Sequence, residues 1–491
     1  MKDQFDFIYY RGSLDFCNYK CEYCPFSKSS ANDEKLEIDR FELKRFVEKI
    51  RENESALSIF FIPYGEALIH KYYMQTIAEL SCRENIKGVG IQTNNSFSVD
   101  MFNSIIKEYG ASKEKLRLWC SFHPSQIDVD SFYRQCEKII ESDIAFSVGA
   151  VAISSNLGMI TELREKLPSQ VYLWLNRADG AVKDYTEEEI AKFTSIDPYF
   201  QLEVTRPKSD FLNCSAGKTS VLVNANGKLV PCVYARSSFG NFYTERRVSE
   251  FCRSGACNCF ISYSNRENIE LLNRFGEEKR FRMPKAETKS VYCFDVDGTL
   301  LDHDGNISDE IHDKIKRMSE SEGNILLLNT ALPYEIAFKK CQKIWELLSG
   351  GAFDLGSDIR FFNPSYIRNL TIDVSMLPEN LLKKALNGIT LNKNSNKIVF
   401  FRQHLSDEEG ILLNENFHVE YQRQYVYVVH RDAGKTKSQI FFSRFFFTDE
   451  KRLFMIGNSE NDEVKFGNCY IAKNSGDVSE YLQNTLISED R

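Results

Sequence analysis

Residues 5–26 read FDFIYYRGSLDFCNYKCEYCPF, and this stretch decides the fold predicted for the first half of the chain. It begins with an apolar, aromatic run typical of a buried strand. Three cysteines follow, Cys17, Cys21 and Cys24, spaced C-x3-C-x2-C. Structural zinc usually takes four protein ligands, whereas a four-iron cluster on three cysteines keeps one iron open. The loop therefore predicts an iron–sulfur centre, and a zinc knuckle or unrelated cysteines are the alternative.

Outward from this loop, strand-like runs alternate with helical patterns as far as about residue 204. The runs are FDFIYY, LSIFFIP, GVGIQTN, LRLWCSF, IAFSVGAVA, VYLWLN and YFQLEV, and DRFELKRFVEKIREN is typical of the helices between them. Strand and helix repeated at this spacing favour parallel βα units. We expect an α/β sheet or partial barrel whose site lies at the carboxyl ends of its strands.

The cysteine loop and its flanks resemble the radical S-adenosylmethionine (SAM) superfamily, whose signature is C-x3-C-x-aromatic-C after the first barrel strand. Tyr23 supplies the aromatic residue. The resemblance implies a partial (β/α)6 barrel over residues 1–204, with a [4Fe-4S] cluster on Cys17, Cys21 and Cys24. In that family the open iron binds SAM, and one-electron reduction yields a 5'-deoxyadenosyl radical that abstracts hydrogen from substrate.

Further residues at predicted strand ends match positions where this family contacts SAM. PYGEAL resembles the Gly-Gly-Glu motif, with Tyr64 in place of the first glycine. The predicted SAM-binding residues are Gly65, Glu66, Thr93, Asn94, Ser121 and His123.

A second group of cysteines lies within a predicted extension over residues 205–262. Its members are Cys214 and Cys232, around the Asn-Gly turn of VLVNANGKLVPC, and Cys252, Cys257 and Cys259 in FCRSGACNC. The pattern resembles the twitch and SPASM extensions of radical SAM enzymes, which carry auxiliary iron–sulfur clusters. We predict one auxiliary cluster on Cys214, Cys232, Cys257 and Cys259, with Cys252 as the spare. A structural zinc site satisfies the same spacing.

A charged, cysteine-free stretch over residues 263–289 is predicted to be a linker, and a new domain is predicted over residues 290–491. SVYCFDVDGTLLD places Asp295 and Asp297 at the end of an apolar strand. Two carboxylates so spaced suit a nucleophile and a general acid beside a cation. The motif resembles the haloacid dehalogenase (HAD) superfamily, which implies a Rossmann-like fold and Mg2+-dependent phosphate ester hydrolysis through an aspartyl-phosphate on Asp295.

The same resemblance assigns the remaining residues of the second site. Thr330, after NILLLN, would hold the phosphoryl group, and Lys437 is preferred over Lys435 as the phosphate-binding lysine. Asp295, Asp297, Asn458 and Asp462 would hold Mg2+, although Asn458 stands where an aspartate is usual. Leu332 stands where many sugar phosphatases have an arginine. A decayed, inactive HAD domain is the alternative.

The spacing of these motifs also locates a cap. Because about a hundred residues separate Thr330 from Lys437, we expect a cap over approximately residues 360–430. It contains the strand-like runs LTIDV, KIVFF and YVYVV, and it resembles the α/β C2 cap of Cof-type phosphatases. Such caps select small phosphorylated metabolites.

Bulk properties limit the partners. The net charge of −8 is spread without a basic stripe, and no apolar run is long enough to span a bilayer. We expect a cytoplasmic enzyme that binds neither nucleic acid nor membrane, acts on a phosphorylated small molecule, and takes electrons from a flavodoxin or ferredoxin. The alternatives are a peptide-modifying radical SAM maturase with an independent phosphatase, and a metal-stabilised scaffold or redox sensor.

Overall fold

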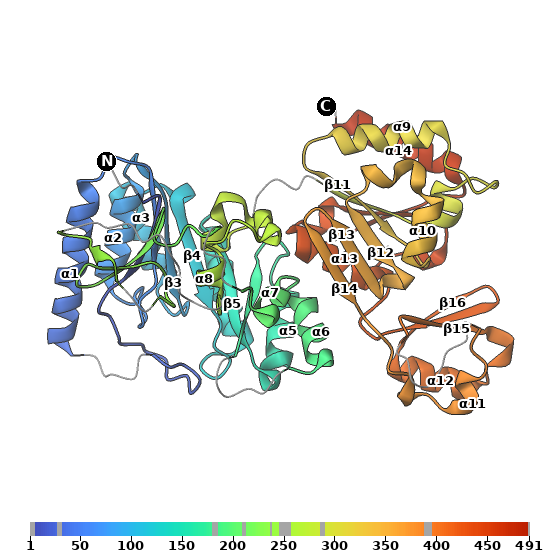
Figure 1. The fold of residues 1–491 in the computed structure, drawn as a ribbon, viewed down its shortest axis with the longest axis horizontal. Helices are drawn as coiled ribbons and strands as arrows, with labels where there is room; N and C mark the ends of the chain where they lie inside the picture. The colour runs from blue at the N-terminus through green and yellow to red at the C-terminus, as the bar shows by residue number, and fades with distance from the viewer. Residues whose placement is uncertain are drawn as a thin grey trace. The chain divides into compact units, whose positions relative to one another are not determined.

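The protein is described by a computed structural model that covers most of the chain. The described residues are 5–26, 32–178, 185–208, 213–235, 238–244, 257–284, 290–386 and 395–489. Contacts divide the chain into two compact units, Met1–Lys285 and Ala286–Arg491 (Figure 1).

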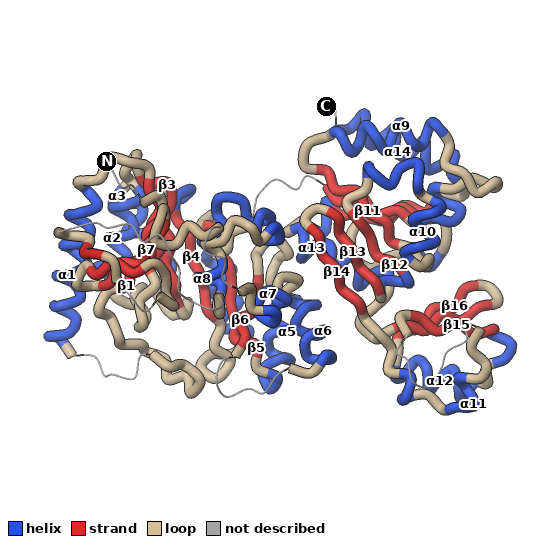
Figure 2. The backbone as a smooth tube through the Cα atoms, in the orientation of Figure 1, coloured by secondary structure: helices blue, strands red, loops and turns tan. Residues whose placement is uncertain are grey.

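The first unit is built on one sheet with the strand order β6-β5-β4-β3-β2-β1-β7-β8-β9 (Figure 2). Its strands are β1 (Phe7–Arg11), β2 (Leu57–Phe61), β3 (Ile86–Thr93), β4 (Leu116–Ser121), β5 (Ala145–Ala152), β6 (Leu173–Arg177), β7 (Ser220–Asn224), β8 (Lys228–Val230) and β9 (Gly240–Asn241). The neighbours from β6 to β7 are parallel, and β8 and β9 form an antiparallel edge. The carboxyl ends of β1 to β6 therefore meet at one edge of the sheet.

Helices connect these strands and cover one face of the sheet. They are α1 (Asp33–Arg51), α2 (Lys71–Ser81), α3 (Val99–Tyr109), α4 (Val129–Glu141), α5 (Leu157–Lys166), α6 (Glu187–Ile196) and α7 (Phe200–Thr205). The short helix α8 (Phe260–Tyr263) follows β9, and its Phe260 ring packs against Trp119, with ring centroids 6.2 Å apart. Alternate strand residues, such as Ile8, Ile59 and Leu118, pack against this layer. Capping fixes the helix ends: Ser98 accepts from a backbone N–H at the start of α3, and Gly110 ends it at φ 63°.

Two predicted segments differ from their expected structure. YFQLEV, expected to be a strand, forms the helix α7, and Asp197 accepts a hydrogen bond from the Tyr199 N–H (2.9 Å) just before the helix begins. A short apolar run does not by its periodicity distinguish a strand from a buried helix.

The predicted linker is the second difference, because much of it packs on the first sheet. A 3-10 helical segment spans Glu270–Phe281, and Phe281 lies against Gly90, where a Cβ atom would come within 2.6 Å of the ring. Arg282 is fully buried, donates to Glu203 Oε1 (3.2 Å), and stacks 3.5 Å from the Phe260 ring centroid. The many charged residues of this stretch led to the prediction of a linker. The apolar side chains between them cover the sheet face opposite the helices.

The second unit has a core sheet with the strand order β14-β13-β12-β11-β10-β18-β19. Its strands are β10 (Ser290–Phe294), β11 (Asn324–Asn329), β12 (Gly350–Phe353), β13 (Asp358–Phe362), β14 (Ser365–Asn369), β18 (Leu453–Gly457) and β19 (Asn468–Ile471). From β12 to β19 the neighbours are parallel, and β13 and β14 form an antiparallel edge. Its helices are α9 (Asp309–Glu320), α10 (Tyr334–Lys340), α13 (Lys435–Phe446) and α14 (Ser475–Glu489).

A smaller sheet with its own hydrophobic core lies between β14 and α13 in the sequence. It has the order β15-β17-β16, with the antiparallel strands β15 (Lys397–Phe401), β16 (His418–Gln422) and β17 (Tyr425–Val429), and the helices α11 (Glu379–Leu382) and α12 (Asp407–Asn416). This α/β module, here called the cap, starts later than the predicted boundary of 360, because β13 and β14 pair into the core sheet.

None of the helices that the structure describes is both long and apolar enough to cross a membrane.

Candidate functional site

The three-cysteine loop leaves the carboxyl end of β1 and is anchored at its start by a buried carboxylate. Asp39, on α1, accepts hydrogen bonds from the Leu14 N–H (2.9 Å) and the Tyr72 hydroxyl (2.9 Å). Buried carboxylates persist where donors surround them, so this contact fixes where the loop begins. Asp39 was not predicted, because its partners Leu14 and Tyr72 lie 25 and 33 residues away along the chain.

Backbone hydrogen bonds from PYGEAL hold the next part of the loop. Gly65 N–H donates to the Leu14 carbonyl (3.1 Å), and Glu66 N–H donates to the Phe16 carbonyl (2.9 Å). A Cβ atom on Gly65 would lie 1.9 Å from the Phe16 carbonyl oxygen. The structure thus gives Gly65 a packing role against the cysteine loop, in addition to the cofactor contact predicted for it.

Glu66 contacts two of the other predicted residues, Thr93 and Asn94. Its carboxylate is buried and accepts hydrogen bonds from the Thr93 hydroxyl (2.7 Å), the Asn94 N–H (2.5 Å) and the Leu68 N–H (3.0 Å). Burial raises the pKa of Glu66 to about 7, although the three donors favour its charged form. The ends of β2 and β3 are thereby joined beside the loop.

The sulfur atoms of the loop meet side chains from neighbouring strand ends. Cys17 Sγ accepts from the Tyr19 N–H (3.4 Å) and from Asn94 Nδ2 (3.6 Å). Cys21 Sγ lies 3.4 Å from His123 Nδ1, which also meets the Tyr23 hydroxyl at 2.7 Å. The structure therefore places His123 and Asn94 beside the cysteines, whereas Ser121 is the last residue of β4.

Burial shifts the ionisation of these groups. It raises the pKa of the Cys17 and Cys21 thiols and lowers the pKa of His123 to about 4. The hydrogen bonds that Cys17 Sγ accepts favour the thiolate, which is the form that ligates iron.

Three reduced thiols on one short loop suit iron more than a hard cation such as Mg2+. Within the described ranges, no three His, Cys, Asp or Glu side chains converge on a single ion site. A four-iron cluster binds each cysteine through a different iron atom, so its ligands do not converge on one point.

The second cysteine group is only partly described, because Cys252 lies outside the described residues. Cys232 is buried, and Cys259 Sγ lies 3.6 Å from the Ser262 hydroxyl. Cys257 N–H donates to the Pro207 carbonyl (3.0 Å). The backbone of Cys214 pairs with that of Arg266 in an isolated antiparallel β-bridge. The choice between an auxiliary cluster and zinc stays a prediction.

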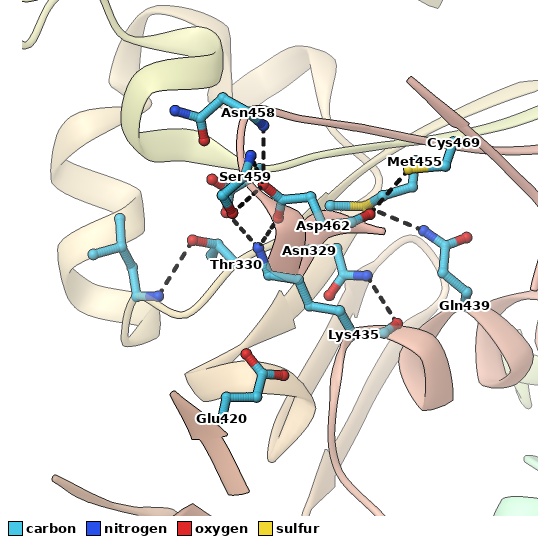
Figure 3. Close-up of polar contacts among 12 residues, drawn as sticks. Asn329, Thr330, Glu420, Lys435, Gln439, Met455, Asn458, Ser459, Asp462 and Cys469 are labelled. Carbon is cyan, nitrogen blue, oxygen red and sulfur yellow. Dashed lines mark hydrogen bonds and ion pairs between the residues drawn. The ribbon is translucent and has the colours of Figure 1, made fainter. Parts of the chain in front are cut away.

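The site of the second unit is centred on a buried lysine between two carboxylates, of which Figure 3 labels Asp462 beside Lys435. Lys435 Nζ donates to Asp295 Oδ1 (2.9 Å) and also to Asp462 Oδ1. The lysine and aspartate side chains are between 0% and 11% exposed, so solvent screens these contacts little. Burial raises the pKa of Asp295, while the two carboxylates raise the pKa of Lys435 above its ordinary value.

The predicted lysine, Lys437, is elsewhere. Its ammonium group donates to the Arg431 carbonyl and lies 3.8 Å from Asp432. Both lysines are in the first turn of α13. Residues two positions apart in a helix point in directions that differ by about 200° around its axis. Lys435 therefore faces the carboxylates and Lys437 faces away, so Lys435 replaces Lys437 in our assignment.

The second carboxylate of the DxD motif is turned away from the buried lysine. Asp297 Oδ1 accepts from Lys340 Nζ at 2.5 Å, and its side chain is 53% exposed. Gly298, the residue after Asp297, has φ 76°. A Cβ atom on Gly298 would lie 2.1 Å from Asn458 Nδ2. Lys340 was not predicted, since 43 residues separate it from Asp297.

Thr330 and Asp462 are held by the loops that follow their strands. Thr330 is buried at the end of β11, and its hydroxyl oxygen accepts from the Leu332 N–H (3.2 Å). Asp462 Oδ2 accepts from the Asn458 N–H (2.9 Å) and from the Ser459 N–H (3.0 Å) and hydroxyl (2.9 Å). Asp462 therefore braces this loop through one oxygen and meets Lys435 through the other.

The cap contributes to the surroundings of this site. Lys397, on β15, donates to the Ala331 carbonyl (2.5 Å) and forms an ion pair with Asp354 (2.9 Å). Tyr427, on β17, pairs with Glu420, on β16, in the register of the cap sheet. Figure 3 draws Glu420, on β16, with its carboxyl group on the side of Lys435.

Carboxylate and amide oxygens are the ligands that Mg2+ prefers, and Asp295, Asn458 and Asp462 supply them. The ammonium of Lys435 lies beside the same carboxylates, as it does in sites that bind a phosphoryl group together with a metal ion. The donor types are therefore compatible with a Mg2+ ion. In this structure all three aspartates meet a lysine, since Lys435 donates to Asp295 and Asp462 and Lys340 donates to Asp297.

Comparison with known proteins gives a family for part of this unit. No curated protein matches the sequence of the chain. The phosphatase BT1666 of Bacteroides thetaiotaomicron is 14% identical over 35% of this chain and 78% of its own, with a TM-score of 0.30. A HAD/COF-like hydrolase from Plasmodium vivax is 14% identical (42% and 98%, TM-score 0.33), and TM0651 from Thermotoga maritima is 13% identical (40% and 97%, TM-score 0.32). Residues 292–343, which carry Asp295, Asp297, Thr330 and Lys340, match the model of the haloacid dehalogenase-like hydrolases.

Proposed function

We propose that the second unit hydrolyses phosphate monoesters through a phosphorylated Asp295. The observation that carries this proposal is the buried lysine between Asp295 and Asp462, at the end of a strand in the matched segment. A lysine so placed counters the negative charge that builds up when a phosphate group meets two carboxylates.

Each residue has a role that follows from its position. An Asp295 oxygen forms a bond to phosphorus as the ester P–O bond breaks, and Asp297 donates a proton to the departing oxygen. Asp297 then takes a proton from water, whose oxygen displaces the Asp295 carboxylate and releases inorganic phosphate. Thr330 and Lys435 hold phosphoryl oxygens. Mg2+, held by Asp295 and Asn458 with Asp462 in support, would neutralise charge on the phosphoryl group.

The cap directs this activity toward small substrates. Its polar sheet face carries Lys397, Glu420 and Tyr427, which suits a hydrophilic leaving group. We infer a Cof-type C2 cap and a small phosphorylated metabolite as the substrate.

Hydrolysis of p-nitrophenyl phosphate tests this proposal. The full chain should release p-nitrophenol with Mg2+ and lose the activity with a chelator, and Asp295→Asn should abolish it. An Asp295→Asn variant as active as the wild type would refute the covalent mechanism. Absence of Mg2+-dependent hydrolysis of any phosphate ester would favour the decayed domain.

We further propose that the first unit is a radical SAM enzyme with a [4Fe-4S] cluster on Cys17, Cys21 and Cys24. The supporting observation is that the loop meets Asn94 and His123 from the ends of two other strands. A reduced cluster with SAM bound supplies the 5'-deoxyadenosyl radical. The chain's own residues position it: Asp39, Gly65 and Glu66 hold the loop, and Asn94 donates toward Cys17.

Iron and sulfide counts on anaerobically reconstituted protein, with 5'-deoxyadenosine assayed in parallel, test the second proposal. The wild type should bind iron and form 5'-deoxyadenosine with a reduced flavodoxin or ferredoxin, and Cys17→Ala should do neither. Cys214→Ala should retain about four irons if an auxiliary cluster exists in the wild type. Equal iron in both proteins would leave zinc for the second group.

The two activities together suggest consecutive steps on one phosphorylated substrate. The phosphatase should then prefer the product of the radical reaction over its precursor, and equal turnover of both would count against the pathway. A peptide-modifying maturase with an independent phosphatase, or a scaffold, remains the competing hypothesis. A wild type with neither SAM cleavage nor phosphatase activity would favour the scaffold.

A further inference from the structure

Lys340 is a charged side chain in the second site that the mechanism above does not use. It is the last residue of α10, and its Nζ atom lies 2.5 Å from Asp297 Oδ1. The two side chains are 39% and 53% exposed, so the ion pair stands at the solvent-facing side of the site.

The orientation of α10 explains why this lysine and no neighbour reaches Asp297. Ala337 is fully buried and fixes the inner face of the helix. Lys340 is three residues later, on the same side, whereas Lys339 is rotated by about 100°. Both lysines interact favourably with the carboxyl end of the helix, but only Lys340 has an ion-pair partner in the described residues.

Asp297 needs such a partner because little else holds its side chain. Among the described residues, Lys340 is the only side chain that hydrogen-bonds to the Asp297 carboxyl group. An aspartate that is half exposed otherwise samples several rotamers. A proton donor must keep a defined position relative to the oxygen that it protonates, since proton transfer requires a short, aligned contact.

We propose that Lys340 is a positioning residue that orients Asp297 for proton transfer to the leaving group. This inference rests on the proposed phosphatase function. The ammonium group binds Oδ1, which leaves Oδ2 to carry the transferred proton. That proton moves from Oδ2 to the ester oxygen as the P–O bond breaks, and Oδ2 later recovers a proton from the attacking water. Lys340 itself neither gains nor loses a proton.

Lys340 also supplies the site with a positive charge that the loop after Thr330 lacks. The sequence has Leu332 where many sugar phosphatases have an arginine, so the loop after Thr330 contributes no positive charge at that position. The end of α10 brings one to the neighbouring aspartate instead.

The test compares leaving groups that differ in their need for a proton. p-Nitrophenolate departs without protonation, whereas the alkoxide of glycerol 3-phosphate does not. In Lys340→Met, kcat/KM for glycerol 3-phosphate should fall roughly tenfold to a hundredfold further than kcat/KM for p-nitrophenyl phosphate. Lys340→Arg should restore the ratio. Lys339→Met is the matched control, because it removes the same charge from the same helix end without touching Asp297.

Each outcome decides the question. An equal loss for both esters in Lys340→Met would show a merely structural role and overturn the inference, as would an equal change of the ratio in Lys339→Met. A wild type that hydrolyses neither of these nor any other phosphate ester with Mg2+ would refute the proposed phosphatase itself. A wild type that hydrolyses both, with a ratio unaffected by Lys340→Met, would refute only the role of Lys340.

Discussion

Replacing Lys435 by methionine tests the centre of the second site most directly. The substitution keeps the length of an unbranched side chain but removes the ammonium group that lies between Asp295 and Asp462. Both carboxylates are nearly inaccessible to solvent, so the variant has two buried negative charges without a cation. Removing one partner of a buried ion pair costs roughly 3–5 kcal/mol of folding free energy.

This cost has a thermal signature and a pH signature. For a unit of about 200 residues, it corresponds to a lower unfolding midpoint by roughly 6–20 °C. Without the lysine, the folded-state pKa of Asp295, which burial already raises, should rise further above its value in the unfolded chain. A raised carboxyl pKa makes the folded state bind more protons, so stability is lost as pH rises. The deficit should be largest near neutral pH and should shrink below about pH 5.

Differential scanning calorimetry on the full chain, between pH 4.5 and 8, provides the assay, with Lys437→Met as the matched control. Both variants lose one lysine from the first turn of α13, but only Lys435 contacts the carboxylates. Mg2+ should raise the midpoint of Lys435→Met more than that of the wild type, because it supplies the missing positive charge. An equal midpoint for Lys435→Met and Lys437→Met at neutral pH would refute the assignment of Lys435.

Three further predictions concern the first unit. Gly65→Ala should displace the cysteine loop, because the new Cβ would lie 1.9 Å from the Phe16 carbonyl oxygen, and the iron content after anaerobic reconstitution should fall relative to the wild type. Because the pKa of Glu66 is raised to about 7, its contribution to stability should decline by roughly 3 kcal/mol as pH rises from 4.5 to 7. Thermal midpoints across this range should show a shallower slope for Glu66→Gln, and parallel slopes would contradict the shift. Arg282→Met should cost roughly 3–5 kcal/mol in urea unfolding, because it leaves the buried Glu203 without its cation; a neutral effect would mean that this segment is not part of the first unit's core.

Local patterns predicted much of the fold. Apolar runs with regular helical spacers correctly predicted β1 to β6, and the Asn-Gly pair predicted the turn between β7 and β8, where Gly227 has φ 83°. These features depend on neighbours in the sequence, so they are visible without a structure. YFQLEV failed as a strand because its helical form depends on Asp197 and on packing within the unit.

The candidate sites show the same division. The DxD motif and the cysteine spacing identify residues that are close in the chain, and the family match to residues 292–343 supports the first of these. The structure chose between Lys435 and Lys437, because the rotation of α13 relative to β10 determines which ammonium group faces Asp295. No local pattern contains that rotation.

The amino-acid order alone places a three-cysteine loop after the first strand and a pair of aspartates after a later one. Strand and turn propensities, together with the spacing of reactive side chains, act over a few residues and can be read directly. Only the tertiary structure decided that Asp39 anchors the loop and that Lys340 reaches Asp297 across 43 residues. These contacts form where separate helices and strand ends pack together, and packing is decided by the whole sheet.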